Sequence, residues 1–214
     1  MGPRELADLP YAAALGPHKG GLTAGGDYDT VHFDQLALDN PDASNARFLE
    51  CAFTRVSVQG GRLRRSRFSD VWLRDVHLTL TDLAETHWTD ATFIGGVAAG
   101  VKAFGAKLQR VAFKGCKLDS VNFRDAELTD VTFDNCLLRD VDFARATLSR
   151  TRFPGSRLSG TDFTGVTMDK VDLRGAELGI IIGPESLRGA IISTAQLIDV
   201  APLLAQGMGL EIED

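Results

Sequence analysis

Large apolar residues recur at every fifth position of the chain from Phe33 to Leu178. Twenty-seven of these thirty positions hold a large apolar side chain, and eleven of the twelve Phe residues lie on them. An α-helix needs an apolar period near 3.6 and a half-buried strand needs a period of two, so neither explains this spacing. A chain that turns a corner after every five residues does explain it, because one position of each unit then always points inward.

A second inward position lies two residues before each large one. It holds small side chains such as Val, Ala, Thr and Cys, with Leu36 and Pro41 as exceptions, and the other three positions are mostly polar, charged or Gly. One large and one small inward residue per unit predicts a chain that closes into a square coil. No single coil can bury its faces alone, so stability is shared between neighbours and the ends need caps.

Units such as VNFRD, AELTD, VTFDN, VDFAR, TDFTG and VDLRG resemble the pentapeptide repeat, over about residues 28–180. The resemblance implies an all-β fold, a right-handed quadrilateral β-helix in which four units make one coil of twenty residues. Coils that pair like strands lie about 4.8 Å apart. Residues twenty apart should then stack, as in the column Phe33, Phe53, Leu73, Phe93, Phe113, Phe133, Phe153 and Leu173.

The two ends lack the regular pattern. Residues 1–27 are expected to form an N-terminal cap, 28–180 the repeat, and 181–214 a final partial coil and a short C-terminal helical cap. Leu187, Ile192 and Leu197 resume the five-residue step in a new frame, and the following segment reads as a helix that Pro202 breaks or restarts.

Two stretches inside the repeat depart from the pattern. Residues 39–46 place Pro41 and Ala43 inward, whereas 95–105 place Ala98 and Ala103 inward and leave Phe104 off the register. Each stretch is either an underpacked coil or a loop that leaves the coil by a multiple of five.

The C-terminal segment carries more apolar side chains than one short helix can hide, namely Leu197, Val200, Leu203, Leu204 and Met208. They either cap the last coil or form a two-fold dimer contact. The family resemblance favours a homodimer.

The sequence shows no catalytic constellation, so we expect no enzyme activity, no cofactor and no metal site. His32, His77 and His87 fall at outward positions on three different sides of a regular coil and cannot converge on a metal. The Gly runs lack the strand–loop–helix context of a phosphate site. Neither a long apolar run nor a signal peptide is present, which favours a cytoplasmic protein with no membrane contact.

The three cysteines all occupy small inward positions. Cys51, Cys116 and Cys136 are therefore expected to be buried free thiols that act as small hydrophobic groups. Cys116 and Cys136 are twenty apart and should stack, close enough in principle for a bridge.

The net charge of −6 comes from the ends, because residues 31–180 contain twenty acidic and twenty basic residues. Within the repeat, one acidic belt is formed by Asp119, Asp125, Glu127, Asp130, Asp134, Asp140 and Asp142. A basic cluster precedes it, formed by Arg55, Arg62, Arg64, Arg65, Arg67 and Arg74. Both could serve solubility and edge protection, since outward charges keep stacked strands from aggregating.

The best-known members of the family protect DNA gyrase and other type II topoisomerases against quinolones or related toxins, as dimeric rods that mimic duplex DNA. About 7.5 coils give a rod of roughly 36 Å. A faithful mimic of that length would need about twenty negative charges that no basic residue compensates, whereas the repeat has no net charge. The resemblance and the acidic belt favour a gyrase-binding DNA mimic, and the neutral sides favour a scaffold for an unrelated protein. The basic cluster lacks interleaved aromatic residues, so direct nucleic-acid binding is not expected.

Overall fold

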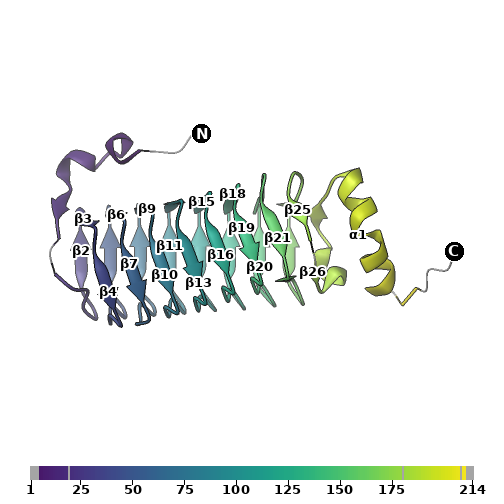
Figure 1. Ribbon diagram of the computed structural model, residues 1–214, viewed down its shortest axis with the longest axis horizontal. Helices are drawn as coiled ribbons and strands as arrows, with labels where there is room; N and C mark the ends of the chain where they lie inside the picture. The colour runs from purple at the N-terminus through teal and green to yellow at the C-terminus, as the bar shows by residue number, and fades with distance from the viewer. Residues whose placement is uncertain (1–4, 19, 180, 208, 211–214) are drawn as a thin grey trace.

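The computed structural model describes residues 5–18, 20–179, 181–207 and 209–210. Short parallel strands stack into a β-solenoid of about eight turns. Figure 1 shows these strands side by side along a rod, with the N-terminal segment lying over one end and a single α-helix at the other. The predicted quadrilateral β-helix with a short C-terminal helix is confirmed.

The coil has four faces, three of which are continuous parallel sheets. Face 1 contains β2 (Asp27–Asp29), β5 (Arg47–Leu49), β8 (Arg67–Ser69), β11 (His87–Thr89), β14 (Lys107–Gln109), β17 (Glu127–Thr129), β20 (Thr147–Ser149) and β23 (Thr167–Asp169). Face 2 contains β1 (Gly16–Pro17), β3 (Val31–Asp34), β6 (Ala52–Thr54), β9 (Trp72–Arg74), β12 (Thr92–Ile94), β15 (Ala112–Lys114) and β18 (Thr132–Asp134), and it continues in β24 (Val171–Asp172) and β27 (Ala190–Ile191).

Face 3 contains β4 (Ala37–Asp39), β7 (Ser57–Gln59), β10 (His77–Thr79), β13 (Val97–Ala99), β16 (Lys117–Asp119), β19 (Leu137–Arg139), β21 (Arg157–Ser159) and β25 (Glu177–Leu178). Face 4 is held by isolated bridges at the same spacing, from Asp42 with Arg62 to Asp142 with Asp162. It ends in the pair β22 (Thr161–Asp162) and β26 (Ile181–Ile182).

Residues twenty apart stack as the repeat predicts. Phe93 of β12 pairs in register with Leu73 on one side and Phe113 on the other. The rings of Phe113 and Phe133 stack with centroids 4.9 Å apart, and those of Phe133 and Phe153 stack at 5.0 Å. The large inward residues therefore form continuous columns along the axis of the rod.

The fifth residue of each unit turns the corner in a left-handed backbone conformation. Every fifth residue from Gly25 to Gly175 has a positive φ, and twenty-one of these residues are not Gly. An αL residue between short extended segments redirects the chain, which lets the next segment start a new face. The sequence pattern indicates the corners but does not by itself indicate this conformation.

Both irregular stretches remain inside the coil. Asp42 keeps its bridge to Arg62, and Ala98 pairs in register with Leu78 and Leu118. Beside Ala98 the interior holds a cavity of about 60 Å³. The structure therefore shows that residues 95–105 form an underpacked coil and not a loop that leaves the coil.

The N-terminal segment covers both an edge and a face of the coil. β1 pairs with β3 at the edge of face 2, and the ring of His18 lies 4.8 Å from that of Phe33. The segment also contains two 3-10 helices, η1 (Leu6–Asp8) and η2 (Ala12–Ala14). Leu9 and Tyr11 pack with Ala52 and Trp72 on the outside of face 2, in a small cluster separate from the main core.

The C-terminal end closes the last coil. A short 3-10 helix, η3 (Pro184–Leu187), precedes β27, which pairs with β24 at a spacing of nineteen residues. The helix α1 (Thr194–Gly207) follows and contains Pro202 without interruption, so Pro202 does not break it. The Gln196 side-chain amide donates hydrogen bonds to the carbonyls of Leu173 and Ala176, which satisfies acceptors of the final coil.

Candidate protein-binding surface

The acidic belt runs around the rod instead of gathering on one side. Asp119 lies on face 3, Glu127 on face 1, Asp134 on face 2 and Asp142 on face 4. The remaining three lie at corners between faces, and they are Asp125, Asp130 and Asp140. A flat partner surface could therefore meet only part of the belt at once.

Most carboxylates of the belt are held by a cation. Asp125 accepts from Arg145 at 2.7 Å, Asp130 from Arg150 at 2.6 Å, and Glu127 lies 2.8 Å from the Lys107 ammonium. Asp119 pairs with Arg139, and Asp142 pairs with Arg124 at 2.5 Å. Asp134 and Asp140 have no ion-pair partner among the residues that the structure describes.

These ion pairs follow the period of the coil. Asp125 and Arg145, Asp130 and Arg150, and Asp119 and Arg139 are each twenty residues apart. An acidic residue followed twenty positions later by Arg is visible in the sequence, and combined with the coil period it predicts the pairing. Counting the charges of residues 119–142 alone missed this arrangement.

Hydrogen bonds from Arg side chains favour the ionised form of the belt carboxylates. The guanidinium groups of Arg139, Arg145 and Arg150 lower the pKa of the carboxyl groups on Asp119, Asp125 and Asp130, respectively. The pairs are exposed, so water and salt screen them. Much of the belt is consequently a ladder of neutral pairs, unlike the bare phosphates of duplex DNA.

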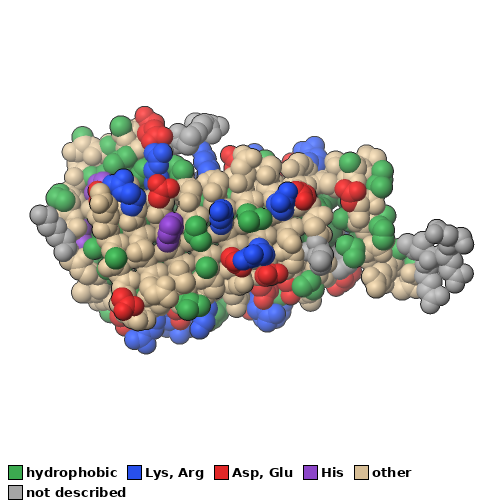
Figure 2. All heavy atoms as spheres, in the orientation of Figure 1, with side chains coloured by type: hydrophobic (Ala, Val, Ile, Leu, Met, Phe, Trp, Pro, Cys, Tyr) green, Lys and Arg blue, Asp and Glu red, His purple; other side chains and the backbone are tan. Residues whose placement is uncertain are grey.

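The basic cluster is organised in the same way. Arg55 pairs with Asp34 at 2.8 Å and Arg62 with Asp42 at 3.2 Å. In the same cluster, Arg64 lies 3.5 Å from Glu85, and Arg74 pairs with Glu5 of the N-terminal segment. Figure 2 shows blue and red side chains close together on the visible side of the rod, with no extended area of one sign.

The structure separates the histidines as the register predicts. His32 lies on face 2, His77 on face 3 and His87 on face 1. The His32 ring bonds to the Thr54 hydroxyl at 2.9 Å, and His18 packs against Tyr28 and Phe33. Within the described part of the chain, no three His, Cys, Asp or Glu side chains are grouped to hold a metal.

All three cysteines are buried free thiols, as predicted. Burial raises the pKa of Cys51 to about 11. The pKa of Cys136 is also raised, because its thiol is hydrogen-bonded to Cys116 and lies away from water. Cys51 and Cys136 are therefore protonated, enclosed thiols, which are poor nucleophiles.

The C-terminal end exposes apolar side chains, although not all of those expected. Leu197 is 47% exposed on α1, whereas Leu203 and Leu204 are half-buried. Val200 is only 2% exposed because it packs on its own chain, so it is not available to a partner in this structure. Met208 lies outside the described residues.

One exposed residue of α1 is absent from the set of apolar side chains expected from the sequence. Ile198 is 69% exposed, more than any other large hydrophobic residue of α1. No helix in the described ranges combines the length and the apolar character needed to cross a membrane.

Comparisons with known proteins agree with the repeat and with the fold. A model described as the pentapeptide repeat region matches residues 106–181. Full-length QnrB1, a plasmid-mediated fluoroquinolone resistance protein, is similar in structure with a TM-score of 0.69 at 17% identity, over 91% of this chain and 100% of QnrB1. No curated protein matched the chain in sequence.

A second solved structure is HetL, a pentapeptide repeat protein involved in heterocyst differentiation regulation from the cyanobacterium Nostoc sp. strain PCC 7120. HetL is 18% identical to this chain in sequence. The alignment covers 78% of this chain and 90% of HetL, with a TM-score of 0.46. Residues 106–181 therefore form a pentapeptide repeat region, and the unbroken five-residue register and the four-sided coil show that the flanking coils follow the same pattern.

Proposed function

We propose that this chain is a non-catalytic cytoplasmic protein that binds DNA gyrase or a related type II topoisomerase and protects it against quinolone-like poisons. The observation that carries the proposal is the likeness in fold to QnrB1, which extends over all of that fluoroquinolone resistance protein. The dimensions agree with it, because about eight coils at strand spacing give a rod of roughly 38 Å. One turn of duplex DNA is about 34–36 Å long.

Recognition of this protein by the topoisomerase would have to depend on the shape of the rod and not on its charge density. Five of the seven belt carboxylates are paired, so the rod presents alternating charges where duplex DNA presents a continuous negative backbone. Asp134 and Asp140 are the belt residues left to meet cations on a partner. An Arg of the partner could also replace one member of an existing exposed pair at small cost, because each such pair is weak.

The proposed active form is a homodimer joined through the C-terminal end. Leu197 and Ile198 present apolar surface on α1, and a two-fold contact between two copies would cover it. Two rods of this length joined at their tips would span about two turns of duplex DNA.

A supercoiling assay with purified gyrase tests the proposal. Micromolar protein should either inhibit supercoiling or restore it in the presence of a quinolone. The double variant Asp134→Lys, Asp140→Lys should weaken this effect, whereas Asp39→Lys, which is exposed on face 3 near the other end, should not. If the wild-type protein changed neither the basal nor the quinolone-inhibited reaction, the topoisomerase assignment would be excluded.

The neutral, ion-paired faces favour one other function, that of a scaffold for an unrelated protein. Mixed charges that are already paired within the chain suit a partner with a similar pattern of both signs. Affinity capture with the wild-type protein, followed by identification of the bound proteins, distinguishes the two functions. A reproducible partner set that contains no topoisomerase would favour the scaffold.

A further inference from the structure

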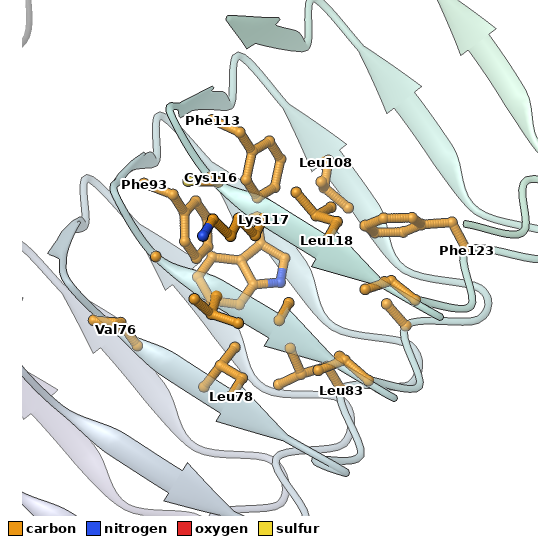
Figure 3. A pocket seen from close by; sticks show the side chains of 17 residues that line it. Val76, Leu78, Leu83, Phe93, Leu108, Phe113, Cys116, Lys117, Leu118 and Phe123 are labelled. Atoms are coloured by element: carbon orange, nitrogen blue, oxygen red, sulfur yellow. The ribbon is translucent and has the colours of Figure 1, made fainter. Parts of the chain in front are cut away.

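The cavity lies inside the coils that contain β10, β13 and β16. Figure 3 shows its aromatic and aliphatic lining from close by. At this level Ala98 stands between Leu78 and Leu118 in its column, and Gly96 follows the same twenty-residue spacing as Val76 and Cys116. Because Ala98 and Gly96 are smaller than their neighbours in these columns, a space of about 60 Å³ is left unfilled.

The walls of the cavity are apolar and include Trp88, Phe93 and Phe113. The lining also includes Val97 and Lys117, which occupy outward positions on face 3. Phe93 and Ala98 are inward residues, yet both are only partly buried, whereas Phe133 in the same column as Phe93 is fully buried. The apolar interior is therefore open to small molecules at this level, next to face 3.

Lys117 is the one charged residue among those that line the cavity, and no ion pair holds it within the described part of the chain. Asp119, on the same strand, is already paired with Arg139. The neighbouring strand β13 contributes only Val97, Ala98 and Ala99 to face 3. An anion at this opening would thus find a cation with no competing intramolecular partner.

We propose that this cavity is a binding site for a short aliphatic carboxylate, with the hydrocarbon tail between Trp88 and Ala98 and the carboxylate at the Lys117 ammonium. An apolar cavity of this kind stays dry and takes apolar guests, and about 10–15 Å³ holds one water-sized group. A space of about 60 Å³ accordingly holds a tail of about four carbons. The site is independent of the proposed topoisomerase function, because it requires no partner protein.

Titration with pentanoate, followed by tryptophan fluorescence, tests the site, since Trp88 lines the cavity and Trp72 lies on the outside of face 2. The signal should saturate at millimolar concentrations, as expected for so small a ligand. Ala98→Leu restores the large residue of the repeat and should abolish the response while the circular dichroism spectrum stays unchanged. The matched variant Ala37→Leu, at an exposed position of β4, should bind pentanoate like the wild type.

The role of Lys117 has its own readout. Lys117→Gln should weaken pentanoate about tenfold, because a charge-assisted hydrogen bond is lost, and it should leave the binding of neutral 1-pentanol unchanged. Lys102→Gln, on face 4, should alter neither. The proposal is overturned if wild-type protein gives no saturable signal, if Ala98→Leu binds as the wild type does, or if pentanoate and 1-pentanol bind equally well.

Discussion

At the scale of the single residue, the corner of each five-residue unit is the position with the strongest backbone requirement. The αL conformation disfavours L-residues by roughly 1–2 kcal/mol, with Gly, Asn and Asp the least affected. Many corners of this chain carry Gly, Asn or Asp, but Leu80 has φ +54° and is 62% exposed. Burial of the Leu80 side chain therefore offsets little of the energetic cost of this backbone conformation.

Leu80→Asn should therefore stabilise the protein by about 0.5–1 kcal/mol, because Asn tolerates the left-handed region better. The free energy of unfolding in urea measures the change. Leu137→Asn is the control, since Leu137 is 38% exposed on a strand with an ordinary backbone and should give no gain. An equal or larger gain at Leu137 would show that removing an exposed Leu, and not backbone conformation, explains the effect.

At the scale of the element, each strand is only two to four residues long and depends on the column of side chains behind it. Phe133 is fully buried, and its ring stacks with those of Phe113 and Phe153. Such a ring has contacts above and below that no neighbouring unit can replace.

Phe133→Ala should cost about 3–5 kcal/mol of unfolding free energy, the usual range for a buried Phe. Phe104→Ala provides the comparison, because Phe104 lies outside the inward register and is partly exposed, with the guanidinium of Arg64 5.8 Å from its ring centre. This substitution should cost less than about 1 kcal/mol. Chemical denaturation of the two variants side by side measures the difference. Similar losses for both would contradict the inward register.

The ion pairs between coils predict a dependence on acid. Because Arg lowers the pKa of Asp119, Asp125 and Asp130 in the folded protein, these carboxylates stabilise it above their unfolded pKa of about 3.9. That contribution should be lost as the pH falls through their lower folded values. Thermal unfolding from pH 6 to pH 2 measures it, and Arg150→Gln should reduce the acid-dependent part. A melting temperature that did not change below pH 4 would contradict this role.

Much of the fold could be predicted from the sequence, because one inward position repeats thirty times and each repeat reports the same geometry. The corner conformation could not be predicted, since a backbone torsion leaves only a weak trace when Arg and Glu occupy the corner as well as Gly and Asn. The continuity of the coil at Ala98 was equally undecided, because a missing side chain fits either a cavity or a loop. The candidate site was predicted least well, because residues 119–142 group their charges in sequence while the coil distributes them over four faces and pairs them across coils.

At the scale of the whole molecule, the two ends differ in what they leave exposed. The N-terminal segment covers Ala52 and Trp72 on face 2, whereas α1 caps the last coil through Gln196 and leaves Ile198 exposed. Because α1 leaves Leu197 and Ile198 exposed, the C-terminal end is the place where we propose that a second copy binds.

If the proposed dimer forms, Ile198→Asp should convert it into a monomer of 23.1 kDa, because the charge would be buried without a partner at the two-fold contact. Light scattering after size-exclusion chromatography measures the mass. Leu80→Asp, at an exposed apolar residue far from α1, should leave the dimer intact. A wild-type protein that is monomeric at high micromolar concentration would exclude the C-terminal dimer.

The square coil itself is tested most directly by cross-linking cysteines placed at outward positions. His87 on β11 pairs in register with Lys107 on β14, so the two Cα atoms lie at strand spacing, about 4.8 Å, within the range that a disulfide needs. The double variant His87→Cys, Lys107→Cys should form a disulfide under mild oxidation, whereas His87→Cys, Lys102→Cys should not, because fifteen residues place the second cysteine on face 4. A disulfide that forms between cysteines fifteen residues apart in preference to cysteines twenty residues apart would contradict the four-sided coil.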